Sequence, residues 1–209
     1  MTQSDGPGSP GSRLVGIAGP SCSGKTELAR WLSQATGAPV LNLDHYYIDL
    51  AHLPLEVRAR TNFDEPGSVD RDAILADAAA LRLGRAIHAP QYNFATHSRT
   101  PGDEIITPGP LVILEGLFAL YWPELRELLA LKLFVEAPGE VCLARRLARD
   151  VVERGRTPES VRWQFETTVQ PGARQFILPS QAHADLVLSG TEPLKGSCRK
   201  ALEALHSLG

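Results

Sequence analysis

The sequence is poor in the features that mark membrane, secreted and nucleic-acid-binding proteins. No apolar run among its 209 residues approaches the ~20 residues that a membrane-spanning helix needs. Its three cysteines are widely spaced, odd in number and form no C-x-x-C pair, which argues against a disulfide framework or a zinc site and suits a reducing compartment. The net charge of −3 leaves no basic excess for DNA or RNA. We therefore expect a cytoplasmic protein that acts on small molecules, without nucleic-acid or membrane partners.

Length and composition predict one large domain. An apolar share of 43% and a charged share of 22% are ordinary for a globular protein. Residues 1–12 are rich in Gly, Ser and Pro and lack the basic-then-apolar order of a signal peptide, so we expect a disordered tail there. Residues 13–209 should form a single domain with a substantial core, and no internal repeat is visible.

The most informative motif is a complete G-x-x-x-x-G-K-[ST] phosphate-binding loop. It reads Gly19-Pro20-Ser21-Cys22-Ser23-Gly24-Lys25-Thr26. In such loops the backbone N–H groups wrap the nucleotide phosphates, the lysine reaches the β- and γ-phosphates, and the final hydroxyl contacts Mg²⁺. The flanks fit, because residues 13–18 are an apolar run typical of a strand and residues 27–32 open a helical pattern. The sequence therefore predicts binding of a nucleoside triphosphate.

The rest of the chain alternates between apolar strands and helices. Short apolar runs predict further strands at residues 40–43, 111–114, 131–135 and 185–188. Helical patterns lie at residues 69–83, 139–153, from 158 onward and 192–205. This alternation predicts an α/β fold, a doubly wound parallel sheet with helices on both faces. Residues 85–107 differ, because two β-prone pieces flank a polar, aromatic middle, and we expect a β-hairpin excursion that leaves the main sheet.

Two acids follow predicted strands directly. Asp44 comes after residues 40–43 and Glu115 after residues 111–114. Ligands of doubly wound sheets sit at the carboxyl ends of the strands, so both acids should lie near the phosphate loop. An acid there can bind Mg²⁺ or accept a proton from an attacking hydroxyl, and a helix-capping or solvated carboxylate is the alternative for each.

A second cluster of charge is basic. Five arginines lie within residues 145–156, at Arg145, Arg146, Arg149, Arg154 and Arg156. If the segment is helical, its apolar stripe consists of Val141, Ala144, Leu147, Ala148 and Val151. The arginines would then project from an adjacent face, and Gly155 would let its neighbours swing. Mobile arginines neutralise charge and exclude water during phosphoryl transfer, which predicts a lid; a solvated basic helix face is the alternative.

Residues 90–99 match neither a clean strand nor a clean helix. They carry Tyr92, Phe94 and His97 at every second or third position. These rings could form a stacking pocket with one hydrogen-bonding tip, or they could serve hairpin packing alone. Cys22 lies inside the phosphate loop. We interpret it as a small residue that fills the turn, and a redox-sensitive thiol is the alternative.

The ordered set of motifs resembles one family, the uridine-cytidine kinases within the phosphoribulokinase/uridine kinase group. The resemblance spans about residues 14–190. Besides the phosphate loop it includes residues 43–47 (LDHYY), 62–66 (NFDEP), 92–99 (YNFATHSR), 114–121 (LEGLFALY), 145–150 (RRLARD), 153–156 (ERGR) and 184–185 (AD). It implies transfer of the γ-phosphate of ATP or GTP to the 5′-hydroxyl of uridine or cytidine, a step of pyrimidine salvage, by a homo-oligomer that is often tetrameric.

The resemblance also implies roles for single residues. Asp44 would be the general base, and Thr26 and Glu115 would help to hold Mg²⁺ with Asp44 nearby. The nucleoside contacts would be Asp64 and Arg146 at the ribose, Tyr92, Phe94 and His97 at the pyrimidine, and Gln164. The lid over the phosphates would consist of Arg149, Arg154 and Arg156, with Lys25 inside the loop.

Three positions depart from the family pattern. Asn93 stands where an Asp is usual, His45 where a Ser or Asp is common, and Ser189 where a Pro often precedes the glycine. Two alternatives remain beside the nucleoside kinase. One is a sibling kinase of the phosphoribulokinase-like or nicotinamide-riboside-like kind, and the other is a regulatory nucleotide-binding protein that has lost catalysis. A regulatory protein that has lost catalysis would lack Asp44, Lys25 or the lid arginines, and all of these residues are present in the sequence.

Overall fold

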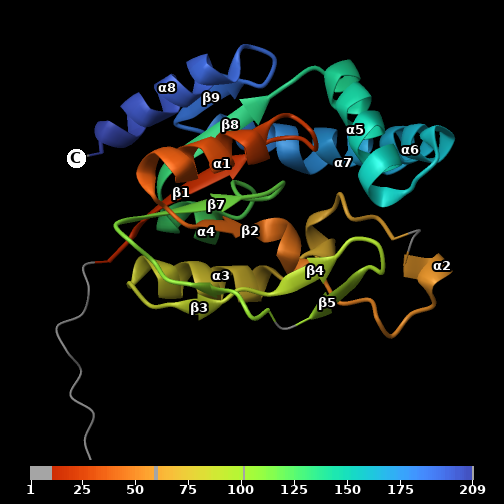
Figure 1. The fold of residues 1–209 in the computed structure, drawn as a ribbon, viewed down its shortest axis with the longest axis horizontal. Helices are drawn as coiled ribbons and strands as arrows, with labels where there is room; N and C mark the ends of the chain where they lie inside the picture. The colour runs from red at the N-terminus through yellow and green to blue at the C-terminus, as the bar shows by residue number, and fades with distance from the viewer. Residues whose placement is uncertain (1–10, 59–60, 101, 209) are drawn as a thin grey trace, which may run out of the picture.

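The computed structural model describes residues 11–58, 61–100 and 102–208. Its central sheet has five strands, all paired in parallel, in the order β2-β7-β1-β8-β9 (Figure 1). The strands are β1 (Arg13–Ala18), β2 (Val40–Asn42), β7 (Leu111–Glu115), β8 (Leu129–Glu136) and β9 (Leu186–Ser189). The predicted α/β fold with a doubly wound parallel sheet is confirmed.

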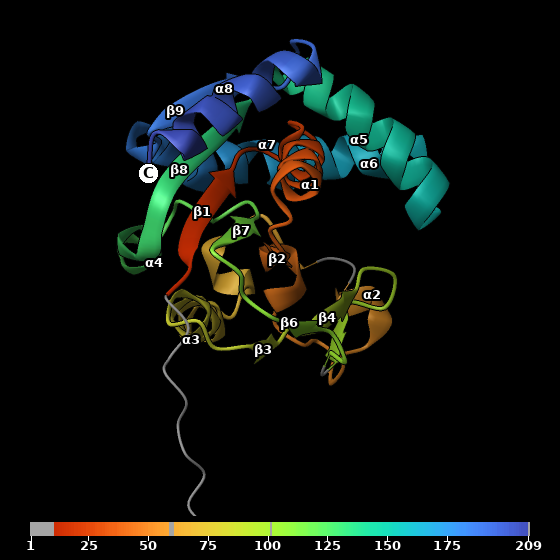
Figure 2. The same cartoon turned by 60° about the vertical axis from the view of Figure 1, so that its left-hand side comes forward.

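Helices cover both faces of this sheet (Figure 2). The helices are α1 (Lys25–Thr36), α2 (Leu55–Arg58), α3 (Arg71–Arg82), α4 (Pro123–Leu128), α5 (Gly139–Arg154), α6 (Pro158–Gln164), α7 (Gln170–Gly172) and α8 (Leu194–His206). Side chains along β1 alternate between two cores, as the period of a strand requires. Val15 and Ile17 pack in the core that α1 and α8 complete, whereas Leu14 and Ala18 pack in the core that α3 and α4 complete.

The first helix has the boundaries that its sequence signals predict. Gly24 precedes α1 with a φ of 112°, a conformation that costs a glycine little. At the other end Gly37 is left-handed, and its N–H donates to the carbonyl of Ser33. The amino-terminal boundary of the domain lies earlier than expected. Ser12 is only 5% exposed and its hydroxyl donates to Gly109, so it belongs to the folded part, while residues 1–10 of the expected tail lie outside the described chain.

The excursion between residues 85 and 107 is a double hairpin. β3 (Ile87–His88) pairs antiparallel with β6 (Ile105–Ile106), and β4 (Gln91–Asn93) pairs antiparallel with β5 (Ser98–Thr100). The prediction of a hairpin off the main sheet is therefore confirmed. The expectation that residues 90–99 hold no clean strand is wrong, because cross-strand pairing supplies what the irregular polar pattern does not show.

The apolar stripe predicted for α5 is wrong. Its buried residues are Cys142, Arg146 and Asp150, whereas Val151 is exposed and its neighbour Val152 is 82% exposed. The reason is the place of the helix. α5 follows β8 and lies beyond the carboxyl ends of the strands (Figures 1 and 2), so its inward face meets polar groups of the site instead of the sheet.

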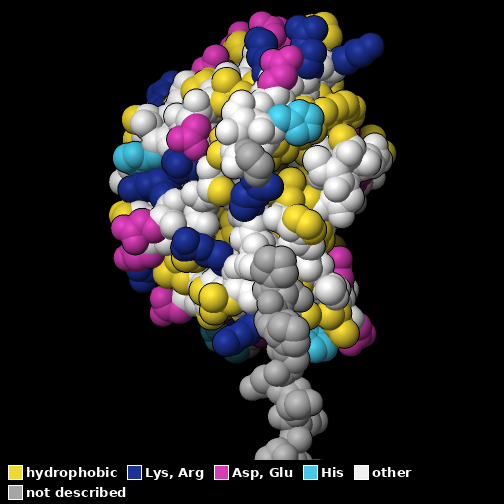
Figure 3. Space-filling view, turned by 90° about the vertical axis from the view of Figure 1, so that its left-hand side faces the viewer, with side chains coloured by type: hydrophobic (Ala, Val, Ile, Leu, Met, Phe, Trp, Pro, Cys, Tyr) yellow, Lys and Arg dark blue, Asp and Glu magenta, His cyan; other side chains and the backbone are white. Residues whose placement is uncertain are grey.

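The surface agrees with the balanced composition. Acids and bases are interspersed over the face drawn in Figure 3, with no block of one sign. Within the described ranges, no helix combines the length and the apolar character needed to cross a bilayer. All three cysteines are free, with Cys142 and Cys198 buried.

Candidate active site

A cavity of about 730 Å³ lies at the carboxyl ends of the central strands. Three groups of side chains line it, contributed by the phosphate loop, by the hairpin with its neighbouring loops, and by α5 with the turn after it. Most of the predicted site residues are among them: Ser21, Gly24, Lys25, Thr26, Asp44, Asp64, Tyr92, Phe94, His97, Arg146, Arg149, Arg154, Arg156 and Gln164. Gly19, Ser23 and Glu115 sit behind this lining, so the structure gathers residues that are more than 140 positions apart into one site.

The phosphate loop keeps backbone torsions that L side chains rarely adopt. Gly19 has a φ of 149° and Cys22 a φ of 64°. Cys22 is half-buried and occupies the turn, which agrees with the expectation of a small residue there. The hydroxyl of Ser23 is buried and has no hydrogen-bond partner in the part of the chain that the structure describes. Such strained, polar backbone is typical of loops that hold an anion.

The loop is clamped from outside by Gly190, which sequence reasoning left without a role, and by Arg145, which it placed among the lid arginines. Arg145 donates to the carbonyl oxygens of Cys22 and Ser23, both at 3.2 Å, and to Gly190 at 2.7 Å. Gly190 packs against the loop so closely that a Cβ on it would collide with the Ser23 carbonyl. These bonds fix the carbonyls of Cys22 and Ser23 on the outer side of the loop, while the Ser23 N–H donates to the Pro20 carbonyl within it.

Glu115 and Thr26 form the candidate metal site. The hydroxyl of Thr26 lies 3.2 Å and 3.3 Å from the two carboxylate oxygens of Glu115. Glu115 is 2% exposed, and burial raises its pKa although the ammonium of Lys25 opposes that shift. A buried carboxylate that lacks full compensation is the kind of group that a divalent cation stabilises.

Asp44 completes this group, but it does not end a strand as predicted. It lies in a 3₁₀ turn, η1 (Leu43–Tyr46), which begins where the side chain of Asn42 accepts a hydrogen bond from the Asp44 N–H. A Cβ on Gly116 would lie 3.6 Å from Asp44 Oδ1, which places the carboxylate against the end of β7. The described residues contain no cluster of three His, Cys, Asp or Glu side chains that could hold a metal. Mg²⁺ in nucleotide sites takes one or two carboxylates plus phosphate oxygens, and this donor set fits that need.

At the other end of the cavity five rings form what we call the ring pocket. Its members are Tyr47, Phe63, Tyr92, Phe94 and His97. His97 stacks on Phe63 with ring centroids 4.8 Å apart and planes 10° from parallel. Tyr47 lies 5.3 Å from both Phe63 and Tyr92. Sequence reasoning missed Tyr47 and Phe63 as site residues, although both lie in motif segments of the resemblance.

His97 is held in an unusual state. Its φ of 50° is left-handed, and its ring makes no hydrogen bond to another described residue. Burial lowers the pKa of His97, and the cations Arg156, Arg154 and Arg58 lower it further. The imidazole is therefore neutral near pH 7 and presents one donor and one acceptor nitrogen.

Asn93 has a role in the turn beside the ring pocket. Its carboxamide oxygen accepts hydrogen bonds from the N–H groups of Ala95 at 2.9 Å and Thr96 at 3.1 Å. An Asp at this position would offer the same acceptor, so the departure from the family pattern preserves the turn that places Phe94 and His97.

Asp64 is buried between the ring pocket and the arginines. Burial raises its pKa, Arg146 opposes that shift, and Asp44 adds to it. Gly172 allows the approach of α7, because a Cβ there would collide with the Asp64 carbonyl. In its ionised form, which Arg146 favours, the carboxylate can accept hydrogen bonds from hydroxyl groups of a ligand.

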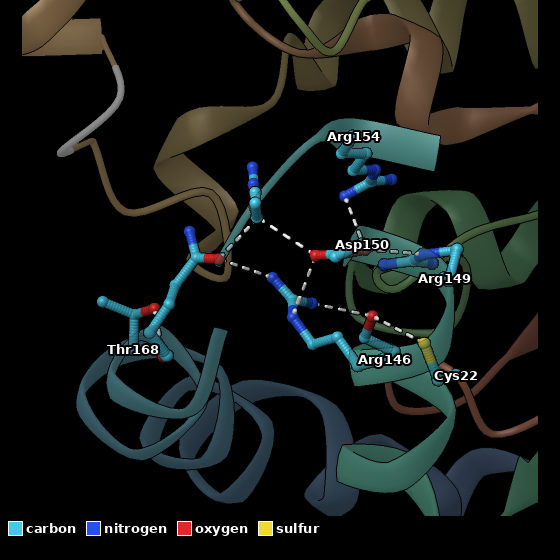
Figure 4. A network of polar contacts seen from close by, with 9 residues as sticks. Cys22, Arg146, Arg149, Asp150, Arg154 and Thr168 are labelled. Atoms are coloured by element: carbon cyan, nitrogen blue, oxygen red, sulfur yellow. Dashed lines mark hydrogen bonds and ion pairs between the residues drawn. The ribbon is translucent and has the colours of Figure 1, made fainter. Parts of the chain in front are cut away.

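Four arginines gather around Asp150, and we call them the arginine cluster: Arg146, Arg149, Arg154 and Arg156 (Figure 4). The expectation that Gly155 lets its neighbours swing stays a prediction. Gly155 caps α5 with a φ of 62° and its N–H donates to the Asp150 carbonyl. Asp150, which the sequence analysis gave no role, is the centre of the group.

Gln164 links the cluster to α6. Its side-chain oxygen accepts from Arg146 at 2.9 Å and from Arg156 at 2.6 Å. Arg146 also donates to the hydroxyl of Ser21 at 3.1 Å, so the cluster touches the phosphate loop directly. The predicted placement of these residues around one cavity therefore agrees with the geometry.

Comparison with known proteins gives the family. The profile of the "Phosphoribulokinase / Uridine kinase family" matches residues 14–193. The chain belongs to this family. It is 43% identical over 180 residues to a uridine kinase of Chloroflexus aurantiacus, covering 85% of this chain and 86% of that protein. It is 39% identical over 201 residues to a uridine kinase of Aliivibrio fischeri, covering 93% and 92% of the two chains.

Among solved structures, the phosphoribulokinase of Rhodobacter spheroides superposes with a TM-score of 0.64 at 15% identity, covering 87% of this chain and 71% of that one. At that level of identity the likeness shows the fold, which is that of a P-loop kinase. The resemblance described from the sequence motifs is confirmed at the level of the family.

Proposed function

We propose that this chain is a pyrimidine nucleoside kinase that transfers the γ-phosphate of ATP or GTP to the 5′-hydroxyl of uridine or cytidine. One observation carries the proposal. A single cavity joins a complete phosphate loop at one end to a ring pocket at the other, with Asp44 and Asp64 among its lining. A flat heterocycle suits the rings, and a ribose with free hydroxyls suits the buried carboxylate of Asp64. The curated relatives named uridine kinase support the same conclusion.

Each end of the cavity has a distinct task. The loop residues Gly19, Ser21, Ser23 and Gly24 would bind the triphosphate together with Lys25. Asp44 would take the proton from the 5′-hydroxyl as that oxygen attacks the γ-phosphorus, and the bond from that phosphorus to the β,γ-bridging oxygen would break. Arg149, Arg154 and Arg156 would stabilise the charge that spreads over the transferred group.

Mg²⁺ would be held by Thr26 and Glu115 with Asp44 nearby, and it would neutralise the β- and γ-phosphate oxygens when bound. The protein's own contribution is to keep these donors in place. Thr26 is fixed in the first turn of α1 and Glu115 at the end of β7, so neither has to move when the nucleotide arrives.

The nucleoside would be recognised from three sides. Tyr92, Phe94 and His97 would contact the pyrimidine, and the width between the rings would exclude a purine. Asp64 and Arg146 would bind the ribose hydroxyls, and Gln164 would orient Arg146. A sugar-phosphate kinase needs cations in place of the rings, whereas five rings form this end of the cavity and Arg154 lies over one of them, Phe94.

A panel of acceptors tests the proposal. A coupled assay with ATP or GTP and Mg²⁺ should give high kcat/KM for uridine and cytidine. Adenosine, ribulose 5-phosphate and nicotinamide riboside should be poor substrates. A preference for ribulose 5-phosphate or nicotinamide riboside would replace the proposal with a sibling activity, and no turnover with any acceptor would favour a nucleotide-binding switch. The homo-oligomer that the resemblance implies is a separate prediction, which light scattering of the purified chain would test.

A further inference from the structure

Asp150 has no exposed surface, yet no step of the proposed reaction uses it. Its Oδ1 lies 2.8 Å from Arg149 and 3.6 Å from Arg154, and its Oδ2 lies 3.1 Å from Arg156 and 3.5 Å from Arg146. Each carboxylate oxygen thus forms ion pairs with two guanidinium groups. Figure 4 shows the carboxylate at the centre with the arginines converging from α5 and from the turn after it.

The same residue fixes the backbone of the lid. The carbonyl of Asp150 accepts hydrogen bonds from the N–H of Gly155, which ends α5, and from the N–H of Arg156 at 3.1 Å. Side chain and backbone of one residue therefore hold both the last turn of α5 and the chain that follows it. Because Arg154 and Arg156 flank Gly155, this turn decides where both guanidinium groups point.

The charges of the group do not balance. One carboxylate faces four guanidinium groups, and burial together with the neighbouring arginines lowers the pKa of Arg154 and Arg156. Arg146 Nε is buried and has no hydrogen-bond partner among the described residues. Like charges at this spacing repel one another, and the single charge of Asp150 offsets only part of that repulsion.

We propose that Asp150 is a positioning residue, the counter-ion that keeps the arginine cluster assembled before the nucleotide binds and that shares these arginines with the triphosphate afterwards. The inference rests on the proposed function only in taking a polyphosphate as the second anion. The identity of the acceptor plays no part in it.

The test compares Asp150→Asn with the parent chain by thermal melting, with and without inorganic tripolyphosphate. The variant keeps the size and shape of the side chain, but it loses the charge and replaces one acceptor oxygen with an NH₂ donor. Without the anion it should melt several degrees lower, because the arginines then repel one another without compensation. Tripolyphosphate should raise its melting temperature by more than it raises that of the parent, because the added anion restores the missing charge.

Asp77→Asn is the matched control. Asp77 is a half-buried carboxylate that accepts from the hydroxyl of Tyr46 and lies on α3, outside the cavity. Its loss should lower the melting temperature, but the shift caused by tripolyphosphate should equal that of the parent. An equal shift in Asp150→Asn as well would overturn the proposal and leave Asp150 with a structural role only.

Kinetics supply a second readout. Asp150→Asn should lower kcat by about 10- to 100-fold, because misplaced arginines lose their contact with the transferring phosphate, while the nucleoside KM changes little. If Asp150→Asn does not fold, the melting temperatures of Arg154→Gln with and without tripolyphosphate test the proposal. This variant removes one positive charge from the cluster, so it should lose part of the tripolyphosphate shift; a shift as large as the parent's would contradict the proposal.

The two proposals fail separately. If the melting results are as expected and uridine is not phosphorylated, the proposed acceptor is wrong and the role of Asp150 stands. If uridine is phosphorylated and the tripolyphosphate shifts are equal, the role of Asp150 is wrong and the proposed function stands.

Discussion

The guanidinium group of Arg154 lies 4.9 Å from the centroid of the Phe94 ring. The same side chain pairs with Asp150 at 3.6 Å, so one arginine joins the arginine cluster to the ring pocket. A cation over an aromatic face contributes about 0.5–2 kcal/mol, depending on how far it is desolvated. The two ends of the cavity are therefore linked through a contact that a bound nucleoside would share.

Replacing Phe94 tests this link. Phe94→Leu removes a ring of the pocket and the surface under Arg154, so kcat/KM for uridine should fall by roughly 5- to 30-fold, as expected from about 1–2 kcal/mol of lost ring contacts. Phe176→Leu is the control, because Phe176 packs against Tyr121 away from the cavity lining. Steady-state kinetics that give the two variants the same small loss would show that Phe94 contributes packing alone.

Asp44 should matter for chemistry more than for binding. Asp44→Asn keeps the shape of the side chain but cannot take a proton, so kcat should fall by about 10²–10⁴ with little change in nucleotide affinity. Asp72→Asn, on the exposed side of α3, should keep the activity of the parent chain. Turnover and nucleotide titration on both variants make the comparison. A near-parental kcat in Asp44→Asn would remove Asp44 from the role of base.

His97 should contribute both to recognition of the pyrimidine base and to the fall of kcat/KM at acid pH. His97→Leu should cost roughly 1–3 kcal/mol in kcat/KM for uridine and for cytidine, because a neutral imidazole can pair with either base. Because the pKa of His97 is lowered, the imidazole is still mainly neutral at pH 6.5. We therefore expect kcat/KM to stay constant down to pH 6.5 and to fall only when the pH drops through the pKa of His97.

Burial raises the pKa of Asp64, so this carboxyl group also adds to the pH dependence. His97→Gln separates the two groups, since glutamine does not titrate. Its profile should lose the part of the acid limb that His97 contributes and keep the part due to Asp64. Profiles of identical shape in the parent and in His97→Gln would mean that the protonation of His97 does not govern binding.

Much of this architecture could be predicted from the sequence, because the signals are local. The apolar runs, the phosphate loop and the stop at Gly37 each depend on neighbouring residues. The inward face of α5 could not be predicted by the same rule. Burial there follows charge pairing around Asp150, and a search for apolar periodicity selects the opposite face, including Val151.

The ring pocket shows the second limit. Tyr47 and Phe63 meet the hairpin only because the chain between them folds back, with an isolated antiparallel bridge between Tyr47 and Val69. No local pattern announces such a meeting. The place of Asp44 in a 3₁₀ turn has a local cause, because the Asn42 side chain accepts from the Asp44 N–H and caps the turn where β2 ends.

Gly190 should be irreplaceable for nucleotide binding. A methyl group there would push on the Ser23 carbonyl and disturb the clamp of Arg145, so Gly190→Ala should raise the nucleotide KM at least tenfold and destabilise the fold by about 1–3 kcal/mol. Gly196→Ala is its control. Gly196 lies in α8, and a Cβ added to it would meet open space, so the exchange should stabilise the protein by up to about 1 kcal/mol. Equal nucleotide KM values in the two variants would show that the loop does not need this contact.

The central claim is that the cavity carries phosphate from a nucleoside triphosphate to the 5′-hydroxyl of a pyrimidine nucleoside. The most direct measurement uses ATP labelled in the γ-phosphate with uridine, and 5′-deoxyuridine as the matched acceptor that lacks the attacking hydroxyl. Mass spectrometry and ³¹P NMR should find the label at the 5′ position of uridine and none on 5′-deoxyuridine. Label at the 2′ or 3′ position, or release of phosphate that uridine does not alter, would contradict the account.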